Sequence, residues 1–191
     1  IDLPEMIDYE RPAGGESALQ QAADLLSSAK NPVILNGAGV VLADAIGDTM
    51  KLAERLDAPV CVGYQHNDAF PGSHPLFAGP LGYNGSKAGM DLISQADVVL
   101  CLGTRLNPFS TLPGYGIDYW PKDAKIIQVD INPDRIGLTK KVSVGIIGDA
   151  KQVANSLLNR LSDSAGDSGR AERKAAIAQT KSQWAQQLSS M

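Results

Sequence analysis

The stretch PVILNGAGVV, residues 32–41, decides the fold of this chain. A short apolar strand runs directly into a Gly-x-Gly turn at Gly37 and Gly39, and a helical pattern follows. This order of elements is the entry to an α/β fold of the nucleotide-binding type. The third glycine of a dinucleotide fingerprint falls at Leu42, and no acid for a ribose hydroxyl follows the next apolar strand. The pattern therefore favours the fold and disfavours an NAD site.

The rest of the chain alternates between helix and strand patterns. Apolar positions at helical spacing predict helices at residues 17–29, 43–56, 86–95 and 149–161. Short continuous apolar runs predict strands at residues 33–35, 59–62, 96–102, 125–129 and 143–147. Residues 63–84, rich in glycine and proline, are expected to be irregular. Because apolar strands separated by helices need cover on both faces, the pattern predicts a doubly wound parallel sheet, a Rossmann-like α/β fold in a single domain.

The composition changes after Leu161. Residues 162–169, SDSAGDSG, are typical of a flexible linker. Residues 171–188 carry only a thin apolar stripe, which predicts a tail that frays or packs on a structure outside this chain. The sequence has no initiator Met, so we expect a segment of a longer protein. Its first residues lack the basic start and the apolar core of a signal peptide, so we expect no signal peptide.

Composition and charge narrow the class of protein. The net charge is −4 and the hydrophobic content is 43%, which is average for a globular protein. This balance gives no reason to expect nucleic acid or an anionic membrane as partner, and no apolar run is long enough to span a bilayer. Cys61 and Cys101 each lie in an apolar run, so we expect buried free thiols in a reducing, cytoplasmic setting rather than a zinc site.

The candidate site follows from the predicted sheet. Ligands of doubly wound sheets bind beyond the carboxyl ends of the strands. The loops expected there are residues 37–40, 63–73, 103–118 and 130–137. A connection between a strand and a helix usually needs about 2–6 residues, and the loops at residues 63–73 and 103–118 are the two longest in the chain. Long loops in a compact domain usually bind a ligand or another domain, so we place the candidate residues there.

Each candidate residue allows two interpretations. Gly37 and Gly39 let the backbone approach an anion at a helix start, or they form only a tight turn. His66 is a candidate general base, substrate contact or domain contact, or else a hydrogen-bonded loop residue, whereas His74 suits a structural turn. Arg105 directly follows a buried strand and either binds a phosphate, sulfonate or carboxylate or forms a structural salt bridge.

The run QVDINPDRIG adds two candidates. Asp130 is placed to accept a ribose hydroxyl, and Asn132, which precedes a proline, is expected to shape the turn. Asp149 is most simply a helix N-cap, like Ser86. The sequence offers no Ser/His/Asp or Cys/His constellation, no Walker loop and no CxxC pair. Nothing in it predicts catalysis by this chain alone.

Several motifs, taken in order, resemble one family. The motifs are AKNPVILNGAGV, HPLFAGPLGYNG, ADVVLCLGTRLNPFS, IIQVDINPDRIG and VSVGIIGDA. In their order and spacing, these motifs resemble the central domain of thiamine-diphosphate-dependent enzymes of the acetohydroxyacid synthase type. The resemblance covers residues 1–161, so residues 162–191 are the expected linker toward a C-terminal domain. Within the family, GYQHNDAFPGSHPLFAGPLGYNG and FSTLPGYGIDYWP look most like sulfoacetaldehyde acetyltransferases. Acetolactate synthases and related carboligases or decarboxylases are the alternative.

The resemblance implies a parent protein with three domains. Its N-terminal domain would supply the glutamate that activates thiamine diphosphate. Its C-terminal domain would hold the diphosphate and Mg²⁺ through a GDG…N motif, which GDAKQV at residues 148–153 does not match. The resemblance also implies a homo-oligomer, a dimer or tetramer, and no activity for this segment alone.

The resemblance also bears on a nucleotide site. Some relatives bind FAD in this domain, others bind ADP or coenzyme A, and others leave the site vestigial. The matching positions are Gly37, Gly39, Arg105, Asp130 and Asn132. The FAD binders usually carry an acidic pair after the arginine, where this chain has Leu-Asn-Pro, so we expect no flavin. A hypothesis of another class is a free-standing, sirtuin-like nucleotide-binding enzyme, although its zinc cysteines and catalytic histidine motif are missing here.

Overall fold

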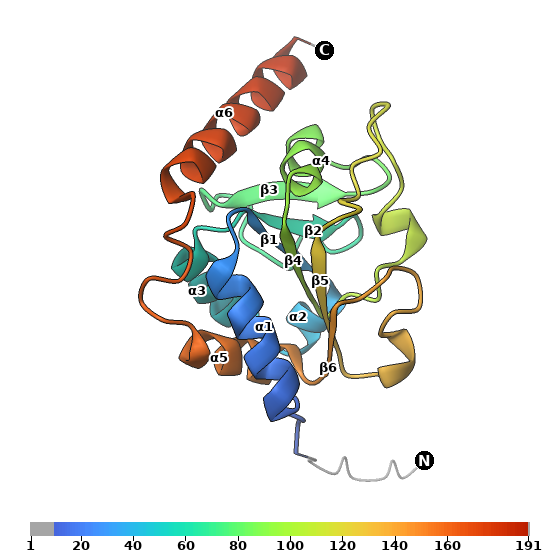
Figure 1. The fold of residues 1–191 in the computed structure, drawn as a ribbon. Helices are drawn as coiled ribbons and strands as arrows, with labels where there is room; N and C mark the ends of the chain where they lie inside the picture. The colour runs from blue at the N-terminus through green and yellow to red at the C-terminus, as the bar shows by residue number, and fades with distance from the viewer. Residues whose placement is uncertain (1–9, 191) are drawn as a thin grey trace, which may run out of the picture.

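The computed structural model describes residues 10–190, which form a six-stranded, fully parallel sheet with helices on both faces (Figure 1). The strands are β1 (Pro32–Asn36), β2 (Val60–Gly63), β3 (Phe77–Leu81), β4 (Val98–Leu102), β5 (Lys125–Asp130) and β6 (Val144–Ile147). Their order is β3-β2-β1-β4-β5-β6. The helices are α1 (Glu16–Ser28), α2 (Ala38–Leu42), α3 (Ile46–Leu56), α4 (Lys87–Ser94), α5 (Ala150–Arg160) and α6 (Arg170–Ser189), with 3₁₀ turns η1 (Pro108–Ser110) and η2 (Pro133–Arg135). The predicted doubly wound α/β fold is confirmed.

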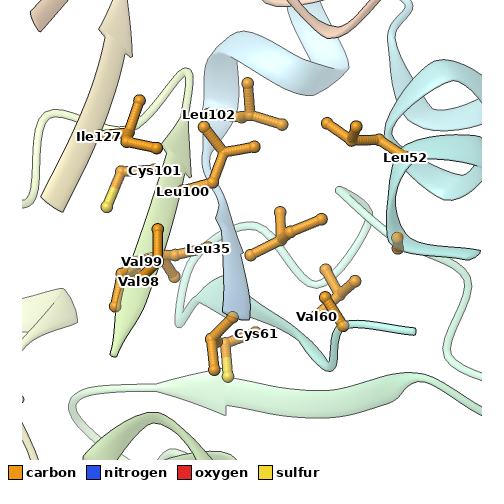
Figure 2. Packing of buried hydrophobic residues seen from close by; sticks show 14 of the residues in the cluster. Leu35, Leu52, Val60, Cys61, Val98, Val99, Leu100, Cys101, Leu102 and Ile127 are labelled. Carbon is orange, nitrogen blue, oxygen red and sulfur yellow. The ribbon is translucent and has the colours of Figure 1, made fainter. Parts of the chain in front are cut away.

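Two layers of helices enclose the sheet. Helices α1, α3 and α5 pack together on one face, and α4 and α6 lie on the other (Figure 1). The central strands β1 and β4 are buried along their whole length, as covered parallel strands must be. Figure 2 shows Leu35 and Leu100 in one cluster with Leu52 of α3. Cys61 and Cys101 lie in the same cluster as free thiols, as predicted. No helix among the described residues is long and apolar enough to cross a membrane.

Two helix starts are fixed by the residues predicted to cap them. Ser86 Oγ accepts a hydrogen bond from the Gly89 amide at 3.3 Å, at the start of α4. Asp149 Oδ1 accepts from the amides of Lys151 at 3.0 Å and Gln152 at 3.2 Å, at the start of α5. Each cap satisfies amides that the first helical turn leaves without partners. The starts of α4 and α5 therefore follow from local sequence.

The prediction of an irregular segment at residues 63–84 is wrong for residues 77–81. This run, FAGPL, pairs in parallel with β2 and forms the edge strand β3. A proline is tolerated in such a strand because one row of its backbone groups faces away from the sheet. Gly79 has a φ of +101°, and a Cβ there would lie 2.5 Å from Ser86 Cβ. The glycine and proline that made the segment look irregular are thus compatible with an edge strand.

The predicted helix at residues 43–56 also begins differently. The chain becomes helical directly after Gly37, in the short α2, and starts again at Ile46 as α3. Asp44 between them has a φ of +52°, a left-handed conformation that interrupts a continuous helix. Leu42, at the position of the third fingerprint glycine, is 80% exposed. No close packing therefore demands a glycine at that position.

Three glycines let two turns cross in direct contact at the carboxyl ends of β1 and β4. The Gly37 amide donates to the Leu102 carbonyl and the Gly39 amide to the Gly103 carbonyl, both at 2.9 Å. A Cβ on Gly37 would lie 2.6 Å from the Gly103 carbonyl oxygen, and one on Gly39 would lie 2.6 Å from Gly103 Cα. We call this contact, formed by Gly37, Gly39 and Gly103, the glycine crossing. Backbone packing alone therefore requires the Gly-x-Gly turn.

The segment predicted as a linker and a fraying tail is held against the domain by Arg173. This side chain is 4% exposed, and its guanidinium donates to the carbonyls of Leu56 at 2.8 Å and Asp57 at 3.1 Å, at the C-terminal end of α3. It also donates to the carbonyls of Lys30, Gly166 and Ser168. Burial lowers the pKa of Arg173, and the nearby Asp57 opposes that shift. Because a guanidinium stays charged and a cation is favourable at a helix C-terminus, Arg173 fastens α6 to α3.

The glycine crossing predicts a large effect of one methyl group. Gly39→Ala is expected to lower the free energy of unfolding by about 1–3 kcal/mol, the usual cost of overpacking. Gly47→Ala is the matched control, because no atom lies within 4 Å of the added Cβ and alanine favours a helix by about 0.5–1 kcal/mol over glycine. Urea denaturation followed by circular dichroism measures both. A Gly39→Ala chain as stable as the original would contradict the crossing.

Arg173→Met is expected to lower the free energy of unfolding by about 2–4 kcal/mol. Each buried carbonyl left without a donor costs about 1–3 kcal/mol, and the total stays below the sum over all the carbonyls because water is expected to replace the lost donor at some of them. Lys174→Met is the control on the same helix: Lys174 is exposed and makes one ion pair, with Asp57 at 3.3 Å, and such a pair at the surface is worth about 0–1 kcal/mol. The urea midpoints of the two variants give the comparison. Equal midpoints would show that α6 is not fastened by Arg173.

Candidate functional site

A cavity of about 470 Å³ lies at the carboxyl ends of the central strands, beside the glycine crossing. Five of the six predicted site residues line it: Gly37, Gly39, His66, Arg105 and Asp130. They come from the loops after β1, β2, β4 and β5, which the parallel sheet brings to one edge. Asn132, the sixth, is not among the lining residues. The predicted loops therefore meet at one place.

The two glycines form part of the cavity wall, but their amides are already used. Both amides donate to carbonyls of the β4 end in the glycine crossing. The following helix, α2, is only five residues long. The tight-turn interpretation thus accounts fully for Gly37 and Gly39. In a ligand site, Gly37 and Gly39 would shape the cavity wall, and their amides would not donate to the ligand.

The positive charge of the cavity comes from three arginines, beside the two aspartates Asp130 and Asp149. Arg105 is exposed, and within residues 10–190 it forms no ion pair or side-chain hydrogen bond, so the structural salt bridge is not formed there. Arg135 also lines the cavity and is exposed. Arg11 lines it too, but its Nη1 lies 3.2 Å from Asp149 Oδ2. Sequence reasoning did not select Arg11 or Arg135. Arg11 lies outside every predicted site loop, whereas Arg135 lies in the run QVDINPDRIG, from which only Asp130 and Asn132 were taken as candidates.

The two residues after β5 have different roles in the structure. Asp130 is buried, and its Oδ1 accepts a hydrogen bond from the Asn132 amide at 2.9 Å. Asn132 Oδ1 in turn accepts from the Asp134 amide at 2.9 Å, at the start of η2. Asn132 therefore shapes the turn, as predicted. Asp130 keeps a place in the cavity wall.

Gln128 is a buried polar residue that sequence reasoning missed. Its Nε2 donates to the carbonyls of Thr104 at 3.2 Å and Arg135 at 3.1 Å, and its Oε1 accepts from the Gly137 amide at 2.9 Å. One side chain thus joins the loops after β4 and β5, which carry two of the cavity arginines. The available signal was a single amide in the otherwise apolar run IIQV, since buried polar groups need partners.

The two histidines differ in how they are held. His74 Nδ1 accepts from the Leu76 amide at 3.2 Å, and its Nε2 lies 3.2 Å from Glu54 Oε1. His74 is therefore structural, as predicted. His66 lines the cavity and is half-buried, and no side-chain hydrogen bond to it is formed within residues 10–190. Its ring is available to a group outside this segment.

The residues that the structure describes do not form a metal site at the cavity. Within residues 10–190 no group of three or more His, Cys, Asp and Glu side chains is placed to hold a metal ion. Asp149, in the GD pair, is committed to capping α5 and to Arg11. Burial raises the pKa of the Cys61 thiol to about 12 and raises that of Cys101 as well, so neither is a ready nucleophile. The arrangement suits binding of an anion.

Comparison with known sequences gives relatives over the whole chain. The sulfoacetaldehyde acetyltransferase of Roseovarius nubinhibens is 78% identical over 191 residues, which are all of this chain and 32% of that protein. The acetolactate synthase large subunit of Corynebacterium glutamicum is 35% identical over 158 residues, which are 83% of this chain and 24% of that protein. The chain therefore spans about a third or less of the length of the relatives it matches.

Comparison with solved structures agrees with the sequence. An X-ray structure of a protein from Mycobacterium smegmatis, described as a thiamin diphosphate-dependent enzyme, superposes with a TM-score of 0.68 at 26% identity, over 83% of this chain and 30% of that one. Residues 19–157 match the family described as thiamine pyrophosphate enzyme, central domain. The predicted resemblance is confirmed, which sets aside the sirtuin-like alternative. The chain belongs to the family of thiamine pyrophosphate enzyme central domains.

Proposed function

We propose that this chain is the central domain of a sulfoacetaldehyde acetyltransferase, which converts sulfoacetaldehyde and phosphate to acetyl phosphate and sulfite. The observation that carries the proposal is the 78% identity, over the whole chain, to the Roseovarius nubinhibens protein of that name. The corresponding identity to the acetolactate synthase is 35%. In this proposal the chain is a scaffold and part of the active-site wall, and it contributes no catalytic residue of its own.

The proposal assigns the cofactors to other parts of the longer protein. Residues 1–161 form the central domain, and residues 162–191 lead toward the C-terminal domain. Thiamine diphosphate and Mg²⁺ are assigned to the N-terminal and C-terminal domains, in line with the family resemblance, and within residues 10–190 no group of acids is placed to hold a metal ion. We place the protein in the cytoplasm, as a homo-oligomer. The two buried free thiols agree with a reducing compartment.

For the cavity we propose a vestigial nucleotide site. It binds ADP, coenzyme A or a simple anion with weak affinity, and it holds no flavin. Arg105 supplies a guanidinium that forms no ion pair within residues 10–190, and Asp130 lies in the wall. Gly37 and Gly39 shape the wall, and Asn132 holds the turn below it. The space of about 470 Å³ is in the range of small-molecule sites.

For the loop at residues 63–73 we propose a place beside the active-site cleft of the longer protein. His66 lies in this loop and lines the cavity, and its ring is free of side-chain hydrogen bonds within residues 10–190. A ring in that state is able to donate to or accept from substrate or a neighbouring domain. His66 is thus the residue of this chain that we expect to affect turnover.

The reaction and the role of His66 are tested together. With sulfoacetaldehyde, phosphate, thiamine diphosphate and Mg²⁺, the longer protein is expected to form acetyl phosphate and sulfite, and the 191-residue chain is expected to form none. In the longer protein, His66→Ala is expected to lower kcat/KM by about 10-fold, the loss of roughly one charge-assisted or polar contact, with an unchanged Tm.

His74→Ala is the matched control, because it removes the hydrogen bonds to Leu76 and Glu54. It is expected to lower Tm and leave kcat/KM of the folded enzyme near normal. Turnover of pyruvate to acetolactate in place of acetyl phosphate formation would move the protein to the acetolactate synthases. Normal kinetics of His66→Ala would return His66 to a structural role.

Isothermal titration calorimetry tests the cavity. The 191-residue chain is expected to bind ADP or coenzyme A weakly, and Arg105→Ala is expected to weaken that binding by about 10- to 100-fold, because a charge-assisted hydrogen bond contributes about 1.5–3 kcal/mol. Lys122→Ala, which removes an exposed cation paired with Asp118 at 3.1 Å and outside the cavity, is expected to bind normally. Absence of any binding by the unsubstituted chain would make the two glycines only a turn.

A further inference from the structure

Four large apolar side chains are exposed together on the loops at the carboxyl end of the sheet. They are Tyr83, Phe109, Leu112 and Tyr115, with exposed fractions between 38% and 63%. We call them the aromatic patch. Tyr83 follows β3, and the other three lie in the long loop after β4. The strands β3 and β4 that precede these two segments are labelled in Figure 1. Exposed apolar residues that occur singly need no explanation, but a group of them marks an interaction site.

The two loops of the aromatic patch are fixed to each other. The Tyr83 amide donates to the Phe109 carbonyl at 3.1 Å. Gly82, with a φ of +84°, lies so close that a Cβ there would meet the Phe109 carbonyl oxygen at 2.0 Å. Tyr115 Oη donates to the Gly85 carbonyl at 3.0 Å. The patch is therefore a preformed surface, and a preformed surface loses little conformational entropy on binding.

The aromatic patch has the composition of an interface core. Residues 76–86 and 106–117 contain no charged side chain. The cores of protein interfaces are enriched in aromatic residues and depleted in charge. The C-terminal helix adds to the same surface, because the ring of Trp184 packs edge-on against Tyr115 with centroids 5.3 Å apart. Leu188, one helical turn further, is also exposed.

We propose that the aromatic patch is the docking surface for another domain of the same longer protein. The chain spans only 32% of the length of its 78% identical relative and matches a family described as a central domain, so most of such a protein lies outside this structure. A domain that is covalently linked meets the patch at a high effective concentration. The inference rests on the proposed central-domain role, but not on the reaction.

Photo-crosslinking tests the proposal in the longer protein. A benzophenone amino acid placed at Phe109 is expected to crosslink to peptides from outside residues 1–191. The same amino acid placed at Leu138, an apolar residue that is 70% exposed and lies outside the patch, is the matched control and is expected to give at most one-tenth of that yield. Crosslinks from position 109 to residues 1–191 of a second copy, or none, would overturn the proposal.

Hydroxyl-radical footprinting gives a second measurement without crosslinker. Tyr83 and Phe109 are expected to be modified at least about five times more slowly in the longer protein than in the 191-residue chain, while Leu138 keeps its rate. Equal rates in the two proteins, or rates that fall as the 191-residue chain is concentrated, would overturn the proposal. Neither method measures turnover, so an inactive protein with a protected patch would refute only the proposed reaction.

Discussion

The glycine crossing is the contact on which the rest of the structure depends. The turns after β1 and β4 touch backbone to backbone, because Gly37, Gly39 and Gly103 leave no Cβ between them. The crossing fixes where α2 begins and in which direction the chain leaves β4. Arg105 follows two residues after Gly103, so its position over the cavity is set by the same contact. A sequence signal usually associated with phosphate binding serves here first to join two central strands.

Most of the fold was predictable because it depends on local periodicity. Apolar runs marked five of the six strands, and Ser86 and Asp149 marked helix starts through caps formed within three residues. The edge strand β3 was missed because its glycine and proline are tolerated only at an edge, and edge position is a tertiary property. The division between α2 and α3 was missed because Asp44 adopts a left-handed conformation that no spacing rule marks.

The position of α6 shows a different limit. In the sequence, RAERKAA looks like a solvated charged face. In the structure, Arg173 is buried because carbonyls from α3, from the turn before β1 and from residues 166–168 converge on it. The location of the candidate site was predictable from the topology, since residues directly after parallel strands gather at one edge of the sheet. Arg11 was missed because its partner, Asp149, is distant in sequence, and Gln128 was missed because the loops that it joins meet only in the folded chain.

Pro80 in β3 has a consequence for how molecules of this protein meet. Proline has no amide hydrogen, and the Pro80 carbonyl already accepts a hydrogen bond from the Ser86 amide at 2.6 Å. The backbone at this point of the edge strand offers neither a donor nor an acceptor to a further strand. Sheet-to-sheet extension, the common route to ordered aggregates, is thereby blocked at this position of the edge. Assembly at this side of the molecule therefore depends on side chains. Side-chain contacts select a particular partner, whereas backbone pairing between strands does not.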